Sequence, residues 1–246
     1  MDISTILGLI SLVIFLVGGV ATKQIPLFLF NMHAIFVVMG GMSVAMLINT
    51  PMKHLLKAVS GFFLIFNEGD TVTPQKMIPV LVNLAEQCRM RGLAAFKEAD
   101  PKVGNGFLLR AASAALEYSD HNFVKQVMEQ EINQGADEFN EVINVYRTMG
   151  ILAPMFGLLG TLIGIVGVLK DLANPESVGP AMAVAITSAF YGIFFANVFC
   201  VPVAGKLRSR LWMEVRVKAM ILDGVLEIMK GSLPLVVERR LQSYLA

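Results

Sequence analysis

Two long segments without any Asp, Glu, Lys, Arg or His constrain the fold of this chain most strongly. They are residues 149–169 and 177–205. Each is long enough to cross a bilayer as a helix, which requires about 20 mostly apolar residues. Both nevertheless contain hydroxyl groups, glycines and a proline, which a simple membrane anchor would not need. This combination predicts membrane helices that line a path along which a group of another molecule moves.

Two further apolar segments near the N-terminus complete the set of four predicted membrane helices. Residues 3–22 and about 26–48 lack Asp, Glu, Lys and Arg, and His33 is their only titratable side chain. Hydrophobic residues make up 55% of the chain and charged residues only 16%, which is rare in a soluble protein. His33 has two interpretations: a packed, hydrogen-bonded residue, which we favour, or a ligand or proton relay.

The flanks of these segments predict the orientation in the membrane, because Lys and Arg beside membrane helices stay in the cytoplasm. Basic residues on one side are Lys53, Lys57, Arg147, Lys206, Arg208 and Arg210. The loops on the other side contain only Lys23 and Lys170. We therefore expect a multi-pass membrane protein with both termini in the cytoplasm. Its basic flanks fit contact with membrane lipid headgroups, and we expect no binding of nucleic acid.

The chain alternates between membrane hairpins and helical segments outside the membrane. The predicted division is a membrane hairpin over 1–48, a cytoplasmic helical domain over 49–147, a second hairpin over 148–205 and a cytoplasmic helical tail over 206–246. Apolar residues at helical spacing follow Thr73 and Pro74, and Gly231 and Pro234 interrupt the tail. We therefore predict an all-α polytopic membrane protein with four transmembrane helices and a helical cytoplasmic bundle.

Small residues recur at helical spacing in the two uncharged segments. A face of small side chains lets two helix backbones approach closely in lipid, where van der Waals packing replaces the hydrophobic driving force. The predicted helix-packing positions are Gly157, Gly160, Gly164, Ala185 and Gly192. Pro154 and Pro202 each remove a backbone donor near the end of a span. They are candidate hinges, and an incidental kink is the alternative.

Thr161, Thr187 and Ser188 place hydroxyl groups within these segments. A buried hydroxyl in a helix commonly bonds to the carbonyl four residues earlier and does nothing more. Alternatively, hydroxyls along a wet seam replace part of the hydration shell of a passing ion. A hydroxyl cannot store a proton at neutral pH, so an ion-driven cycle would need a carboxylate from another chain.

Motifs for catalysis and metal binding are absent from the sequence. It contains no Gly-rich phosphate loop, no nucleophile elbow and no His/Cys/Asp ligand cluster. The two cysteines, Cys88 and Cys200, offer no disulfide or metal framework. We therefore expect no enzyme activity, no metal site and no cofactor.

Three stretches together resemble the flagellar stator A subunits, the MotA/PomA family. They are GILAPMFGLLGTLIGIVGVL, NPESVGPAMAVAITSAFYGIFFANVFCVPVAGKL and the tail MILDGVLEIMKGSLPLVVERRLQSYL. The opening MDISTILGLI, the pair Gly40-Gly41 and the turn Ser119-Asp120-His121 also fit, so the resemblance covers essentially the whole chain. The broader superfamily includes the three-span TolQ/ExbB proteins, and four spans with this tail favour MotA/PomA.

The resemblance implies a cation-conducting ring that rotates in the bacterial inner membrane. Five A subunits would surround two copies of a B subunit, whose single transmembrane Asp carries the transported ion, H⁺ or Na⁺. Ion binding at that Asp would drive rotation of the homopentamer, and the cytoplasmic domain would push on the torque-ring protein of the flagellar rotor. Two alternatives are the same five-to-two motor coupled to a non-flagellar load, and a passive membrane scaffold.

The resemblance also assigns roles to residues by position. The implied ion pathway comprises Pro154, Thr161, Thr187, Ser188 and Ala189, and the implied rotor contacts are Arg89, Arg91, Lys97 and Glu98. Thr161 matches a position where sodium-type members have Thr and proton-type members often have Ala. Ala189 stands where many members have a second Thr, so the two positions point to different ions. Lys97 stands where an acidic residue is common, and a solvated helix face is the alternative role for these charges.

Overall fold

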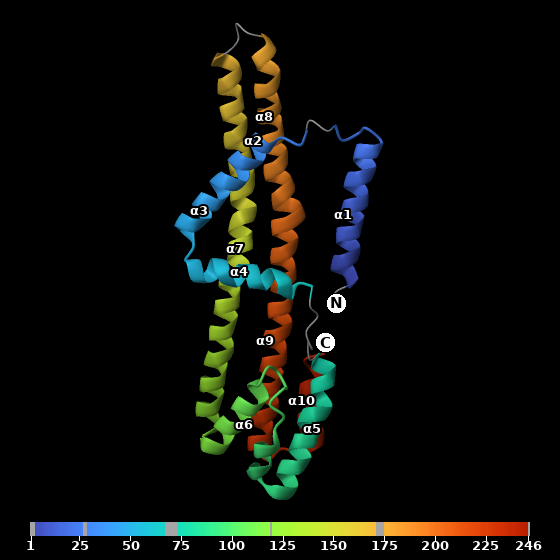
Figure 1. Ribbon diagram of the computed structural model, residues 1–246. Coiled ribbons are helices and arrows are strands. Elements are labelled where there is room, and N and C mark those ends of the chain that lie inside the picture. The colour runs from blue at the N-terminus through green and yellow to red at the C-terminus, as the bar shows by residue number, and fades with distance from the viewer. Residues whose placement is uncertain (1–2, 27–28, 67–72, 119, 171–174, 246) are drawn as a thin grey trace. The chain divides into compact units, whose positions relative to one another are not determined.

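The computed structural model describes residues 3–26, 29–66, 73–118, 120–170 and 175–245. Its elements, shown in Figure 1, are α1 (Ile3–Ala21), α2 (Met32–Ile35), η2 (Phe36–Gly40), α3 (Gly41–Asn49), α4 (Met52–Leu64), α5 (Pro74–Arg91), η3 (Leu93–Glu98), α6 (Phe107–Glu117), α7 (His121–Lys170), α8 (Pro175–Phe194), η4 (Phe195–Cys200), α9 (Val201–Met229) and α10 (Pro234–Gln242). All elements in these ranges are helical, and four continuous helical stretches are long and apolar enough to cross a membrane. The predicted all-α class with four candidate spans is therefore confirmed.

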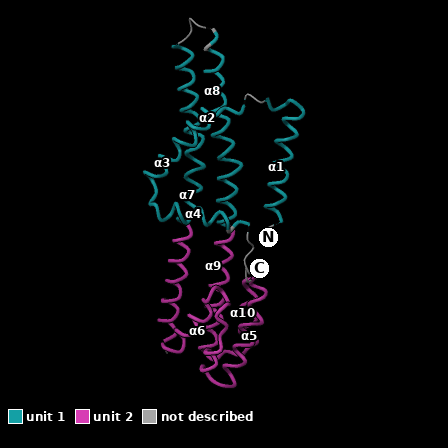
Figure 2. The backbone as a smooth tube through the Cα atoms, viewed as in Figure 1, with its two compact units in different colours: residues 1–69, 141–208 teal, residues 70–140, 209–246 magenta. Residues whose placement is uncertain are grey.

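The chain divides into two compact units, and each unit is built from two stretches of sequence (Figure 2). Unit 1 contains residues 1–69 and 141–208, and unit 2 contains residues 70–140 and 209–246. Helices α7 and α9 contribute residues to both units. The predicted domain boundaries divide the chain where it is expected to enter or leave the membrane, whereas the two units are defined by contacts between residues. The predicted boundaries therefore stay predictions. Helix α4, which they assign to the cytoplasmic domain, has its contacts in unit 1.

In unit 1, the α7–α8 pair forms the frame against which the shorter helices pack. The Tyr191 hydroxyl of α8 donates to the Leu29 carbonyl at 2.7 Å, and α2 packs on α8. The Tyr146 hydroxyl of α7 donates to the Ala58 carbonyl at 2.6 Å and so fastens α4. No residue of α1 is buried. The His33 side chain is exposed in the single chain, so the favoured prediction of a packed histidine is wrong here.

Two of the membrane segments contain a π-helix that the sequence pattern did not predict. Residues 36–40 interrupt the second span, and residues 195–200 join α8 to α9. A π-helix makes backbone bonds over five residues instead of four, and such wide turns occur frequently at functional sites. Both segments are as apolar as their α-helical surroundings, so their composition does not distinguish them. Residues 171–174, the predicted turn between spans three and four, and Ser119 lie outside the described residues.

Unit 2 is a helical bundle around one apolar core. The largest fully buried side chains of this core are Met77, Leu81, Phe96, Phe107, Leu108, Met128, Met220, Ile221 and Leu241. The predicted interruption of the tail is confirmed, since α9 ends at Met229 and α10 begins at Pro234. Gly231 has a φ of +74° there, a left-handed conformation that favours glycine. Helix α10 packs against α5, so the tail holds α5 in place within this unit.

Candidate functional site

Helices α7 and α8 approach each other to backbone contact along one seam. The structure places Gly157, Gly160 and Gly164 of α7 opposite Ser188, Ala189, Ala185 and Gly192 of α8, so all five predicted packing residues lie in the seam. A methyl group added at Gly157 would lie 2.9 Å from the Ser188 carbonyl oxygen, and one at Gly192 would lie 2.5 Å from the Ala153 carbonyl oxygen. Because these neighbours are backbone atoms, they cannot rotate away, and only glycine fits.

The hydroxyl groups of the seam differ in what they bond. Thr161 Oγ1 lies 3.0 Å from the Gly157 carbonyl oxygen of its own helix and 3.2 Å from the Ala185 carbonyl oxygen of α8. It therefore shares one hydrogen between the two helices and retains lone pairs that accept. Thr187 and Ser188 are fully buried and donate to carbonyls of their own helix at 2.6 and 2.7 Å. Their geometry favours the simpler role of back-bonding to the helix.

The remaining predicted pathway residues lie close to this seam. The Cα atom of Pro154 would be 3.1 Å from a methyl group at Gly192, and Ala189 adjoins Gly157. Pro202 lies further along, as the second residue of α9 after the π-helix, and is exposed. Pro154, Thr161 and Ala189 thus all lie along the seam between α7 and α8, and the Thr161 hydroxyl contacts both helices. Among the described residues, no group of three or more His, Cys, Asp or Glu side chains could hold a metal ion.

The four predicted rotor-contact residues lie together at the corner between α5 and η3 in unit 2. Gly92, with a φ of +73°, reverses the chain between these two helices. Arg91 Nη1 and Glu98 Oε1 form an ion pair at 3.1 Å, and Arg89 and Lys97 are also exposed. The corner therefore presents one internally paired carboxylate and an excess of positive charge.

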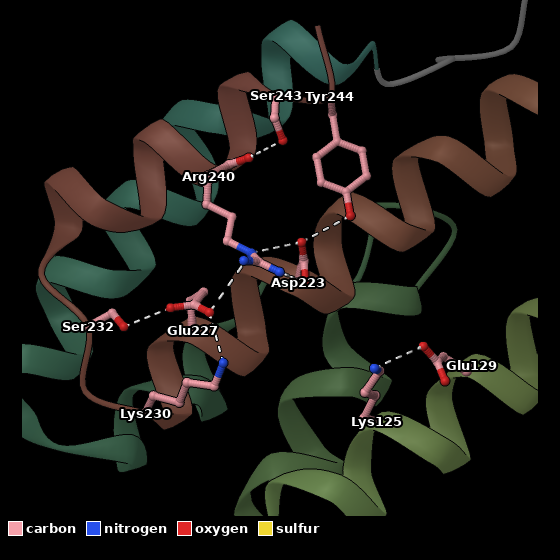
Figure 3. A network of polar contacts seen from close by, with 9 residues as sticks. All are labelled: Lys125, Glu129, Asp223, Glu227, Lys230, Ser232, Arg240, Ser243 and Tyr244. Carbon is pink, nitrogen blue, oxygen red and sulfur yellow. Dashed lines mark hydrogen bonds and ion pairs between the residues drawn. The ribbon is translucent and has the colours of Figure 1, made fainter. Parts of the chain in front are cut away.

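A network of charged residues joins α9 to α10, and sequence reasoning missed it (Figure 3). Arg240 Nε lies 3.1 Å from Asp223 Oδ2, and the Tyr244 hydroxyl donates to the same oxygen at 3.0 Å. Glu227 accepts from Lys230 Nζ at 2.9 Å and from Ser232 Oγ at 2.8 Å. The spacing of 223, 227 and 230 on one helix face was the available signal, but the Arg240 partner comes from a separate helix.

This network changes the acid–base properties of its members. The hydrogen bond from Lys230 is the main cause that lowers the pKa of the buried Glu227 below its ordinary value of 4.5. Burial is the main cause that raises the pKa of Tyr244 to about 12, and the Asp223 carboxylate adds to it. Both shifts stabilise the protonation states that exist at neutral pH. The network therefore fastens α10, and through it α5, at physiological pH.

Replacing Glu227 with Ala is expected to destabilise the protein by about 1–3 kcal/mol, because Ser232 and Lys230 lose a buried acceptor. The lowered pKa sets the pH dependence. The stabilisation is complete above pH 4.5 and is lost as the pH falls through the lowered pKa of the folded state. The thermal unfolding midpoint of purified protein at pH 7 and at stepwise lower pH measures this. The exposed Glu86→Ala is the control, and equal midpoints for both variants at pH 7 would contradict the role of Glu227.

Comparisons with known proteins agree with this architecture. Residues 101–220 match the MotA/TolQ/ExbB proton channel family. The chain is 28% identical to Motility protein A of Bacillus subtilis over 100% of this chain and 91% of that protein. It is 30% identical to the chemotaxis protein PomA of Vibrio alginolyticus over 100% of this chain and 96% of that protein. The flagellar MotAB stator complex from Bacillus subtilis contains a chain that superposes with a TM-score of 0.88 at 28% identity, over 98% of this chain and 95% of that one. The chain therefore belongs to the MotA/TolQ/ExbB proton channel family, among its full-length MotA and PomA relatives.

Proposed function

We propose that this chain is the A subunit of an ion-driven rotary motor whose proton or sodium flux generates torque for flagellar rotation. The observation that carries the proposal is the α7–α8 seam. It is uncharged throughout, it is packed to backbone contact, and it carries one hydroxyl that bridges both helices. Such a pair of helices presents a rigid, weakly polar surface. An ion-carrying side chain of another subunit could move along this surface. The full-length likeness to Motility protein A and PomA supports the same function.

The partner is a B subunit that supplies the missing ionisable group. Residues 149–169 and 177–205 contain no carboxylate, so we expect a transmembrane Asp of that partner to hold the ion. One solved relative is a MotAB stator complex, which supports a partner of this kind. The A subunits form a homopentamer around two copies of it. The B subunit is recognised as the product of a neighbouring gene with one N-terminal membrane helix that contains an Asp.

The corner between α5 and η3 is the surface that contacts the rotor's torque-ring protein. Its four charged residues are exposed, and α10 packs against α5. Its excess of positive charge fits an acidic surface on the rotor. The protein lies in the bacterial inner membrane with both termini in the cytoplasm, so unit 2 can reach a rotor on that side. The basic Lys97 is the observation that favours a non-flagellar load as the second candidate.

Of the two ions we favour sodium, because Thr161 offers a seam oxygen that contacts both helices and retains accepting lone pairs. We expect flagellar rotation in a stator-deleted cell that expresses the chain and its partner, and we expect it to stop when potassium replaces sodium at constant pH. Thr161→Ala should raise the sodium requirement about tenfold, which corresponds to one ligand worth about 1.4 kcal/mol.

Tethered-cell rotation speed at graded sodium concentrations measures both effects. The control is Ser43→Ala, which removes a hydroxyl that bonds to the carbonyl of Met39 in its own helix. Undiminished rotation in sodium-free medium would exclude sodium in favour of the proton, and Thr161→Ala should then be nearly silent. Ion flux without rotation of the flagellum would instead indicate another load.

A further inference from the structure

The π-helix η4 leaves one carbonyl of the fourth span without its helical partners. At the end of η4, the Val201 N–H donates to the Ala196 carbonyl, five residues earlier. In an α-helix the same N–H would donate to the Asn197 carbonyl. The donor that would serve Asn197 in a π-helix belongs to residue 202, which is proline and has no N–H. The Asn197 carbonyl therefore receives neither its α-helical nor its π-helical hydrogen bond, and the Val198 carbonyl also loses its α-helical donor to Pro202.

The side chain of Asn197 adds a second oxygen at the same turn. Asn197 is exposed, although it lies within a segment without charged residues. Its Nδ2 donates to the Ile193 carbonyl at 3.0 Å, and this bond fixes the orientation of the amide. The Oδ1 atom accepts no hydrogen bond from the residues that the structure describes, and an amide oxygen has two accepting lone pairs. Two oxygens with accepting capacity thus lie at one wide turn.

This turn shares a helix face with the predicted ion pathway. Ala189, Ile193, Asn197 and Pro202 are separated by four, four and five residues. Four residues make about one turn of an α-helix, and the five-residue step spans the end of the π-helix, whose turns are wider. These residues therefore lie on one face, which we call the Asn197 face. Ala185, whose carbonyl bonds Thr161, lies one turn before Ala189 and is buried in the seam, whereas Ile193 and Asn197 are exposed. The Asn197 face therefore borders the seam, and the half-buried Ala189 lies between the two.

Gly150 of α7 lies at the level of this turn. Residue 154 is proline, so the Gly150 carbonyl lacks its α-helical N–H donor. A methyl group added at Gly150 would lie 3.3 Å from Cys200 Cβ and 3.8 Å from Val201 Cγ2, which places Gly150 beside the end of η4. Both prolines thus remove backbone donors at the same level of the two helices. Hydrocarbon offers no hydrogen bonds to such groups, so non-helical polar backbone occurs in membranes only where protein covers it or water reaches it.

We propose that the Asn197 face continues the cation path from Thr161 toward the Lys206 end of the span, with Asn197 Oδ1 and the Asn197 carbonyl solvating water and the monovalent cation there. Neutral carbonyl-type oxygens are the groups that replace the hydration shell of such ions in selectivity filters. The inference rests on the proposed function, because it extends the path that begins at the α7–α8 seam. It also assigns a use to the π-helix and to Pro202, which together leave the Asn197 carbonyl without a helical donor.

Water access to the Asn197 face can be measured without ion flux. In the complex with its B subunit, Asn197→Cys should react at least about tenfold faster with a charged methanethiosulfonate reagent than Ile14→Cys does. Ile14 is 65% exposed on α1, a helix without buried residues, and serves as the matched position outside the seam. Cys88 and Cys200 are both buried, so the unsubstituted complex gives the background. Equal or slower labelling at Asn197→Cys would overturn the inference, because it would show a face covered by lipid or protein.

A second variant tests the amide itself. Asn197→Leu should lower cation flux at least about tenfold while native mass spectrometry still shows the assembled ring. Asn49→Leu, at the exposed end of α3, is the control and should conduct normally. If the unsubstituted complex conducts and Asn197→Leu conducts equally well, this inference fails and the proposed function stands. If the unsubstituted complex conducts no ion, the proposed function itself fails, whatever the labelling shows.

Discussion

Gly192→Leu is expected to prevent assembly of the ring that the unsubstituted chain forms with its partner. A side chain at this position meets the Ala153 carbonyl oxygen and the Cα atoms of Pro154 and Gly157, all of which are backbone atoms of α7. Overpacking by a few methylene groups costs about 1–3 kcal/mol even where side chains can move aside. Here α7 and α8 must separate, and the surface that each chain presents to its neighbours changes with them. Gly160→Leu should act in the same direction, since its nearest neighbours are the Cβ and Oγ atoms of Ser188.

Native mass spectrometry of detergent-purified complexes measures this effect. The unsubstituted chain should give a pentamer with two copies of the partner, whereas Gly192→Leu should give monomers or aggregates. Gly8→Leu is the matched control, because a side chain added at this position of α1 meets no atom of the described chain within 4 Å. An unchanged pentamer for Gly192→Leu would show that the seam tolerates separation, and a dimer or tetramer for the unsubstituted chain would contradict the five-subunit ring.

Much of the fold follows from the sequence because the bilayer imposes strong constraints. The four spans are visible from the absence of charge alone, and the end of α9 is visible from Gly231 and Pro234, which cannot continue a helix in their positions. The π-helices could not be predicted. The residues 195–200 have the same apolar composition as an α-helix, and Pro202 was the only nearby signal of a changed hydrogen-bond pattern. Whether a proline widens the turn before it depends on packing, which is not local.

The candidate site was predictable in its packing and not in its polar contacts. Glycines three and four residues apart must share a helix face, and α8 packs against that face. By contrast, Thr187 and Ser188 point in different directions from the helix axis, and their burial depends on the neighbouring helix. The ion pair between Arg240 and Asp223 joins separate helices, so it arises only from tertiary packing. The ion pair between Arg91 and Glu98 also joins separate helices, so the sequence did not predict it.

The chain without its partner is expected to conduct neither protons nor sodium. Moving an unpaired ion from water into an apolar medium costs tens of kcal/mol by solvation. The seam offers one bridging hydroxyl, at Thr161, and two hydroxyls already bonded to their own helix, and these cannot offset that cost. Residues 149–169 and 177–205 contain no Asp or Glu whose carboxylate could neutralise the cation. A carboxylate from the B subunit provides such a group, so flux should appear only when both chains are present.

Ion flux into proteoliposomes is the most direct test of this account. Vesicles that contain a proton-sensitive or a sodium-sensitive dye receive the purified chain alone, the complex with the B subunit, or the complex in which the transmembrane Asp of the B subunit is replaced by Asn. Under an imposed ion gradient and membrane potential, we expect flux from the intact complex and only the leak of empty vesicles from the other two preparations. Robust proton or sodium flux through the chain alone, or no flux through the intact complex, would contradict a subunit that forms its ion path only together with a partner's carboxylate.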